Sequence, residues 1–207
     1  MPRIMLIGAA SLAALAFAAC GDKELATDTT LPPTDTATTT TVDTAAADPE
    51  ASVREAQEFV NAVGQVGLVE IRTSEMALEK GKNAQLKTFA QKMIDEHKAA
   101  GEKLKAAASA AALAPPPETL DDFHMRRIND LVETDGDADF DADYAALQVD
   151  AHNDAIKVVE DYSKDTDAMP QLKAFADEVL PTLVAHKVDA EKVRDTVTKD
   201  SAKSNPS

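Results

Sequence analysis

The chain contains a single cysteine, Cys20, which lies near its N-terminus. One cysteine excludes a disulfide within the chain and leaves no thiolate cluster that could hold a metal ion. A domain built from this chain must therefore be held together by its core. The sequence also lacks the helical zinc-protease motif, the phosphate-binding loop and the nucleophile elbow, so it carries no signature of those enzyme classes.

Basic residues are scarce relative to acidic ones. The sequence has 21 lysines and arginines against 37 aspartates and glutamates, which gives a formal net charge of -16. Such a surface repels phosphate backbones, so we expect no nucleic-acid partner. It also offers no basic patch that would attract a membrane surface. Membrane attachment would have to come from another feature of the chain.

The N-terminus supplies such a feature. Arg3 precedes an almost continuously apolar stretch from residue 4 to residue 19, which is typical of an export signal. The stretch ends in Phe17-Ala18-Ala19-Cys20-Gly21, which resembles a bacterial lipobox. We therefore predict a lipoprotein signal peptide over 1–19 and a lipid on Cys20. The alternative is an ordinary cleaved signal with a chance cysteine. The lipid would hold the chain in the bacterial cell envelope, at the inner or the outer membrane, with its domain in the periplasm.

Residues 20–50 are rich in threonine, alanine and aspartate and contain no aromatic side chain. Such a segment cannot bury enough apolar area to offset the entropy lost on ordering, so we predict a disordered tether after Cys20. A flexible segment of this length spans about 30 Å. We place the folded domain at 51–200 and a disordered tail at 201–207.

Residues 51–200 show helical rather than strand periodicity, with apolar residues every three or four positions. The pattern predicts a first helix from 51 that stops at Gly81, and a second from the N-cap Asn83 to 112. Pro115-Pro116-Pro117 ends the second helix, and a short helix follows over 118–133. The third helix is predicted over 139–164 and the fourth over 169–198, with Pro170 at its start and a kink or local break at Pro181.

The connections predict how these helices are arranged. Very short links join the first helix to the second and the third to the fourth, and short links make antiparallel neighbours. The middle pair is joined by a longer crossing that contains the short helix. We therefore predict an all-α fold, an antiparallel four-helix bundle with a short extra helix in its central crossover.

Each of the four long helices places one metal-binding residue type on its apolar stripe. These residues are Glu70, His97, His152 and His186. A bundle interior normally excludes such groups, because burying an unpaired polar side chain costs roughly 1–3 kcal/mol. One per helix predicts a shared central site.

A carboxylate and three imidazoles suit one transition metal ion: zinc, copper, iron or manganese. Four residues nearby in sequence are candidates to orient the ligands: Asp95, Glu96, Gln148 and Thr182. Two other interpretations remain open. The four core residues could form a buried polar network in which Glu70 pairs with a histidine and helps to set helix register, or they could fail to meet.

Two further features have simpler interpretations. Aspartates alternate along one segment, which comprises Asp135, Asp137, Asp139, Asp141 and Asp143. A calcium loop starting at Asp135 would need glycine and glutamate where the chain has Phe140 and Ala146. We interpret the segment as an acidic turn that favours the start of the third helix. His124 lies outside the main helices, and we predict that it is a surface residue.

Residues 55–193 resemble a bacterial envelope family known as domain of unknown function 4142. The resemblance rests on four stretches: Glu58-Phe59-Val60 with Gly67-Leu68-Val69-Glu70, the run from Leu86 to Ile94 with His97, Tyr144 to His152, and Leu172 to Ala176 with Leu180-Pro181-Thr182-Leu183 and His186. The family commonly has aspartate where this chain has Glu96. The resemblance implies a ferritin-like four-helix bundle and an envelope location, but no established activity.

The ferritin comparison has a chemical limit. Di-iron bundles place a glutamate three residues before a histidine on each of two helices. Here Ile94, Val149 and Leu183 stand at that position, so we expect no ferroxidase centre. The leading hypothesis is a membrane-anchored envelope module that binds a transition metal. The alternative is a non-catalytic structural or protein-interaction module with a buried Glu/His network, and a ferritin-like oxidoreductase comes last. No motif identifies a protein partner.

Overall fold

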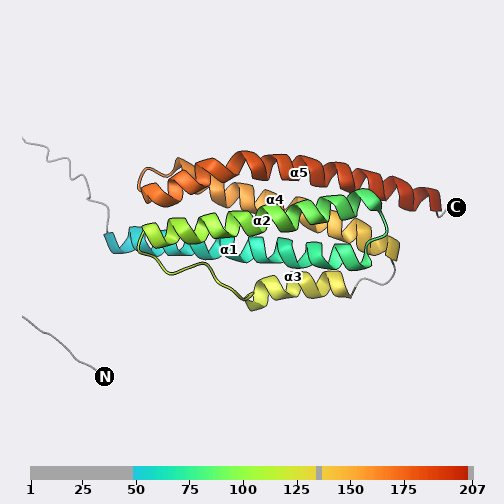
Figure 1. Cartoon of the computed structure of the whole chain (residues 1–207), viewed down its shortest axis with the longest axis horizontal. Helices are drawn as coiled ribbons and strands as arrows, with labels where there is room; N and C mark the ends of the chain where they lie inside the picture. The colour runs from blue at the N-terminus through green and yellow to red at the C-terminus, as the bar shows by residue number, and fades with distance from the viewer. Residues whose placement is uncertain (1–48, 134–136, 205–207) are drawn as a thin grey trace, which may run out of the picture. The chain divides into compact units, whose positions relative to one another are not determined.

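The computed structural model describes residues 49–133 and 137–204. The described part contains five α-helices and no strand: α1 (Pro49–Lys80), α2 (Ala84–Ala110), α3 (Asp122–Val132), α4 (Asp137–Lys164) and α5 (Pro170–Ser204). The four long helices α1, α2, α4 and α5 form a bundle, and α3 lies beside α1 on its outside (Figure 1). The predicted all-α bundle with an extra helix in the crossover is confirmed.

Neighbouring helices of the bundle run antiparallel. The short links after α1 and α4 make the pairs α1–α2 and α4–α5, and α1 also packs on α4 while α2 packs on α5 (Figure 1). Each long helix therefore has two bundle neighbours and turns one face to the centre. None of the described helices is both long enough and apolar enough to cross a membrane.

Most helix ends match their sequence signals. Asn83 caps α2, with its side-chain oxygen accepting from the amides of Gln85 at 2.8 Å and Leu86 at 3.1 Å. Pro170 is the first residue of α5, where its missing donor costs nothing. Pro181 lies inside α5, which continues through it as one helix, so the predicted local break is absent.

The outer boundaries differ from the predicted ones. The helix α1 begins at Pro49 rather than at 51, and α5 continues to Ser204, so most of the predicted tail at 201–207 is helical. The short helix and α4 begin at 122 and 137, rather than at 118 and 139. The predicted signal peptide at 1–19, Cys20 and nearly all of the predicted tether lie outside the described residues.

The apolar core consists of two clusters. The first lies toward the α1–α2 turn and includes Phe89, Met93 and Tyr144. The second lies toward the α4–α5 turn and includes Phe59 and Leu172. On each long helix, the candidate site residue falls between the residues of the two clusters: 70 on α1, 97 on α2, 152 on α4 and 186 on α5. The polar layer thus divides the core.

Two glutamines of α1 hold the crossover that follows α2. Gln65 donates through Nε2 to the carbonyl of Thr119 at 3.0 Å and accepts at Oε1 from the amide of Asp121 at 3.1 Å. Gln57 accepts from the amide of Ala114 at 2.9 Å. Gly64 lets the prolines approach, because a Cβ there would come within 2.9 Å of Pro116 and Pro117. These contacts fix the crossover along α1.

Asp141 has a role that the sequence did not predict. It lies inside α4, is buried, and its carboxylate accepts from the amides of Lys82 at 3.1 Å and Asn83 at 2.8 Å. Interpreting the whole run as an acidic turn was therefore wrong for Asp141. The side chain ties the start of α4 to the α1–α2 turn. Gly81 allows this approach, since a Cβ there would come within 3.2 Å of Asp141 Oδ1 and within 2.5 Å of the carbonyl oxygen of Ala77.

The substitution Asp141→Ala tests this tie. It leaves two backbone N–H groups in a partly buried place without their acceptor, so we expect a loss of about 1–3 kcal/mol in the free energy of unfolding. Urea denaturation followed by circular dichroism measures the change. Asp150→Ala, at an exposed position of the same helix, is the matched control and should change stability by less than about 0.5 kcal/mol. Equal effects of the two substitutions would contradict the role of Asp141.

Candidate metal centre

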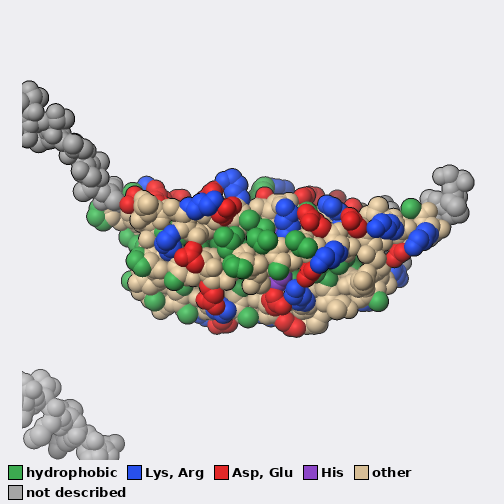
Figure 2. Space-filling model, turned by 90° about the horizontal axis from the view of Figure 1, so that it is seen from above, with side chains coloured by type: hydrophobic (Ala, Val, Ile, Leu, Met, Phe, Trp, Pro, Cys, Tyr) green, Lys and Arg blue, Asp and Glu red, His purple; other side chains and the backbone are tan. Residues whose placement is uncertain are grey.

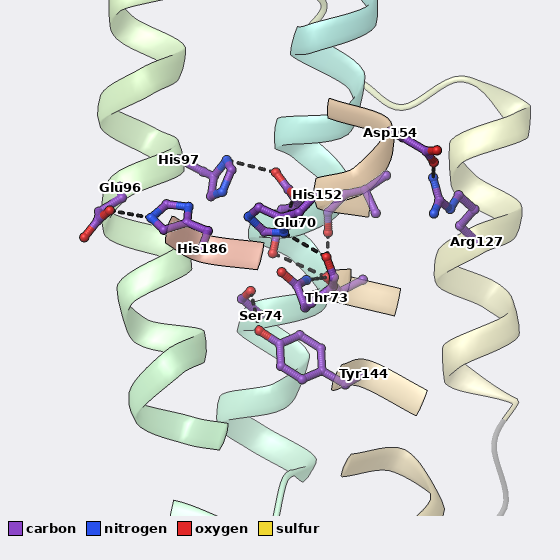
Figure 3. Close-up of polar contacts among 12 residues, drawn as sticks. Glu70, Thr73, Ser74, Glu96, His97, Arg127, Tyr144, His152, Asp154 and His186 are labelled. Carbon is purple, nitrogen blue, oxygen red and sulfur yellow. Dashed lines mark hydrogen bonds and ion pairs between the residues drawn. The ribbon is translucent and has the colours of Figure 1, made fainter. Parts of the chain in front are cut away.

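The four predicted residues meet in the middle of the bundle. Glu70, His97, His152 and His186 come from α1, α2, α4 and α5 respectively, and each is at least 93% buried. The three imidazole rings lie 5.3–5.5 Å apart between centroids. Figure 3 shows the rings grouped together, with Glu70 on the α1 side. Side chains more than twenty residues apart in sequence thus form one buried cluster.

The Glu70 carboxylate contacts two of the histidines. Its Oε2 accepts from His97 Nδ1 at 2.9 Å, and its Oε1 lies 3.2 Å from His152 Nδ1. His152 Nδ1 is closer to the carbonyl oxygen of Gln148, at 2.8 Å, so that carbonyl is the principal acceptor. The carboxylate therefore contacts the Nδ1 side of both rings.

The third histidine is oriented from outside the cluster. His186 Nε2 donates to Oε2 of Glu96 at 2.5 Å, and the Glu96 side chain is partly exposed (Figure 3). Because ionised carboxylates and carbonyls only accept hydrogen bonds, the nitrogen that faces each of them must carry the proton. In their neutral forms, His97 and His152 would therefore carry the proton on Nδ1, and His186 on Nε2.

The opposite nitrogen of each ring has no partner. His97 Nε2, His152 Nε2 and His186 Nδ1 are buried and accept no hydrogen bond from any described residue. One ring nitrogen of each histidine lies within 4.8 Å of those of the other two, so these three side chains could hold a metal ion. Tetrahedral zinc at 2.0–2.1 Å from each ligand needs nitrogens about 3.3 Å apart. Binding an ion would therefore shorten the nitrogen–nitrogen distances by up to roughly 1.5 Å.

The buried groups of the cluster shift one another's pKa values. Burial acts to raise the pKa of Glu70, but the facing imidazoles of His97 and His152 outweigh it and lower that pKa below its usual value. Burial acts to lower the pKa of His97, and the Glu70 carboxylate outweighs it and raises that pKa. Burial lowers the pKa of His186 to about 4, against the opposing effect of Glu96. His186 is therefore neutral at pH 7, which is the form that binds a metal.

The four predicted orienting residues have different surroundings. Glu96 contacts His186 directly, and Gln148 contacts His152 through its main-chain carbonyl rather than its amide side chain. Asp95 is exposed and accepts from Gln91 Nε2 at 3.0 Å. Thr182 is exposed on α5. The structure thus places two of these residues against the histidines and two on the surface.

The sequence analysis missed three residues that extend the polar layer. Thr73 Oγ1 accepts from Gln148 Nε2 at 3.1 Å, and the hydroxyls of Ser74 and Tyr144 lie 2.8 Å apart (Figure 3). All three are fully buried, and burial raises the pKa of Tyr144. Their signal was the position of Thr73 and Ser74 three and four residues after Glu70, one helical turn along the same face.

A polar cavity reaches the histidines between α2 and α5. Its volume is about 190 Å³, and its lining includes Glu96, His97, Glu178, Thr182 and His186. Figure 2, viewed from the side of α5, shows part of a histidine between acidic and basic side chains on this face. Lys103 also lines the cavity and pairs with Glu178 at 2.7 Å, so a route to the imidazoles passes this ion pair and Glu96.

Comparisons with known proteins identify a family but no characterised relative. The family model described as domain of unknown function (DUF4142) matches residues 40–193, which include α1, α2, α4, most of α5 and the whole histidine cluster. No curated protein and no solved structure matches the chain.

Proposed function

The chain belongs to the DUF4142 family, and we propose that it is a lipid-anchored module of the bacterial envelope that binds one transition metal ion through His97, His152 and His186. Two observations carry the proposal: each of the three buried rings has one nitrogen without a hydrogen-bond partner, and one ring nitrogen of each histidine lies within 4.8 Å of those of the other two. A buried polar atom without a partner costs about 1–3 kcal/mol. A single ion would satisfy all three at once.

The orientation of the rings supports the same proposal. Metal-binding histidines usually donate their other ring N–H to a carboxylate or a carbonyl, which fixes the ring and makes the ligand more basic. Here the Glu70 carboxylate, the Gln148 carbonyl and the Glu96 carboxylate accept hydrogen bonds from those three N–H groups. In this arrangement Glu70 orients His97 rather than binding the ion as the sequence predicted. Three protein ligands leave one tetrahedral position for water or another small ligand.

The donor set narrows the choice of metal. Three imidazole nitrogens suit zinc, copper and iron, whereas manganese favours carboxylate, carbonyl and water oxygens. Three histidines with a fourth position open form a ligand set that zinc commonly takes, so zinc is the first candidate.

The envelope location rests on the N-terminal residues. The apolar stretch followed by Phe17-Ala18-Ala19-Cys20-Gly21 supports cleavage before Cys20 and lipid attachment to it. An acidic chain gains nothing from anionic membrane surfaces, so the lipid supplies the attachment. The proposed module would then bind metal in the periplasm, close to the membrane.

The second candidate is a structural or interaction module without metal. The Glu70–His97 pair favours it, because Glu70 Oε2 and His97 Nδ1 satisfy each other without any ion. Such a buried pair helps to set the register of the helices against one another. The two candidates differ in metal stoichiometry, and in whether a chelator lowers stability.

Metal content distinguishes the metal-binding module from the structural module. We expect the chain without signal and lipid, residues 21–207, to bind one equivalent of zinc by calorimetry and mass spectrometry, with a melting temperature that a chelator lowers. His97→Ala and His152→Ala should each abolish stoichiometric binding while helix content persists. His124→Ala is the matched control, since His124 lies on α3 away from the cluster, and it should bind as the unmodified chain does. No uptake of zinc, copper or iron would leave the structural module as the function.

The Glu96 carboxylate should tune affinity without binding the ion. Glu96→Ala removes the acceptor that orients His186, and loss of such an outer partner typically weakens metal binding 10–100-fold. Asp95→Ala is the matched control, because Asp95 is a neighbouring carboxylate that is exposed and bonds to Gln91 instead. Zinc titration against a competing chelator measures both variants. Equal affinities would show that Glu96 does not act through His186.

The anchor has its own test. Cys20→Ser removes the only thiol of the chain, so we expect an unlipidated precursor that keeps its signal peptide and fails to incorporate labelled fatty acid. Gel mobility and intact mass would report processing. A variant that is still cleaved after Ala19 and carries lipid would contradict anchoring through Cys20.

A further inference from the structure

A second cavity reaches the cluster from another side, and it is apolar. Its volume is about 130 Å³, and it lies among α1, α2, α5 and the crossover, with one contribution from α4. The lining includes Val63 and Gly67 of α1, Leu104 of α2, Ala155 of α4 and Phe175 of α5. At its inner end lie Glu70 and His97.

The walls determine which chemistry fits. Among the lining residues only Glu70 and His97 carry ionisable groups, and these are hydrogen-bonded to each other at 2.9 Å. An anion would meet the carboxylate, and a charged or strongly polar molecule would lose its water without gaining a partner. The cavity therefore suits a neutral, apolar molecule.

The glycines on the lining leave room for such a molecule. A Cβ at Gly67 or Gly101 would meet nothing within 4 Å, whereas one at Gly64 would press on Pro116 and Pro117. Gly101 is exposed, so the cavity opens to solvent on that side. Gly67 is partly buried, and packing does not require glycine there, although glycine in a helix interior is less favourable than alanine. The absence of a side chain at Gly67 keeps the space beside it open.

The volume sets the size of the occupant. An apolar cavity of about 150 Å³ in another protein stays dry and takes up benzene or xenon, and this cavity is of similar volume. We infer that it binds a small neutral apolar molecule, no larger than about one aromatic ring, which lies against the Glu70–His97 end of the cluster. The inference rests on the walls alone, so it does not depend on metal binding.

The apolar cavity shares part of its lining with the polar cavity. His97, Ala100, Val179 and Leu183 line both the apolar cavity and the polar cavity between α2 and α5. The two spaces are thus neighbours of opposite chemistry. A cation would come by one route and a neutral molecule by the other, and both would reach His97.

Benzene is the probe that tests the inference. Chelator-treated chain, residues 21–207, is titrated with benzene, and side-chain signals are followed by NMR. We expect saturable shifts centred on the methyl groups of Val63, Val179 and Leu183 and on the His97 ring. Gly67→Leu places a side chain in the open space and should weaken benzene binding at least tenfold. Ala106→Leu, at an exposed position of α2 outside the cavity, should leave the affinity unchanged.

Two results would overturn the inference: no saturable shift, or an unchanged affinity in Gly67→Leu. If that variant fails to fold, crystals of the unsubstituted chain under xenon pressure decide the matter. A xenon peak between Gly67 and Phe175 supports the site, and its absence contradicts it. Because these measurements use metal-free protein, they succeed or fail independently of zinc binding.

Discussion

The structure depends on one constraint: the polar side chains buried across the middle of the bundle must be hydrogen-bonded or paired with one another. Glu70 and the three histidines are almost fully buried, between two apolar clusters. An unpaired charge in such a place would destabilise the fold severely. The bond between Glu70 and His97 removes that cost for the carboxylate and one ring. It also fixes the height of α1 against α2, because a slip of one turn would separate the two side chains.

The same constraint explains which nitrogen of each histidine is left without a hydrogen-bond partner. One N–H of each ring donates a hydrogen bond to an oxygen on its own or a neighbouring helix. Those oxygens determine which ring nitrogen is left without a partner. A network built only for stability would satisfy both nitrogens of each ring. Three bare nitrogens in one buried place are therefore a persistent cost in the metal-free fold. Binding of one ion turns that cost into stabilisation, and this is why we favour a metal module over a purely structural one.

Helical periodicity was enough to predict the bundle, the crossover helix and the convergence of Glu70 with the three histidines. Periodicity assigns a residue to a face, and two short links determine which helices are neighbours. It could not assign the exact partners, because those depend on side-chain rotamers and on the relative heights of the helices. Hence Glu70 was expected as a ligand, and its role as a ligand stays a prediction; the structure shows its carboxylate in contact with Nδ1 of His97 and of His152. Asp141 was misinterpreted for a related reason: a carboxylate in an acidic run gives no sign that it faces the amides of another turn.

The most direct test of the central claim is the anomalous diffraction of crystals grown with one equivalent of zinc, collected on both sides of the zinc absorption edge. The account predicts a single strong peak inside the bundle, about 2.0–2.1 Å from one nitrogen each of His97, His152 and His186. It also predicts that the Glu70 carboxylate remains bonded to His97 rather than moving to the ion. A histidine cluster without a peak, or zinc found only on surface carboxylates, would contradict the account and leave the layer as a structural network.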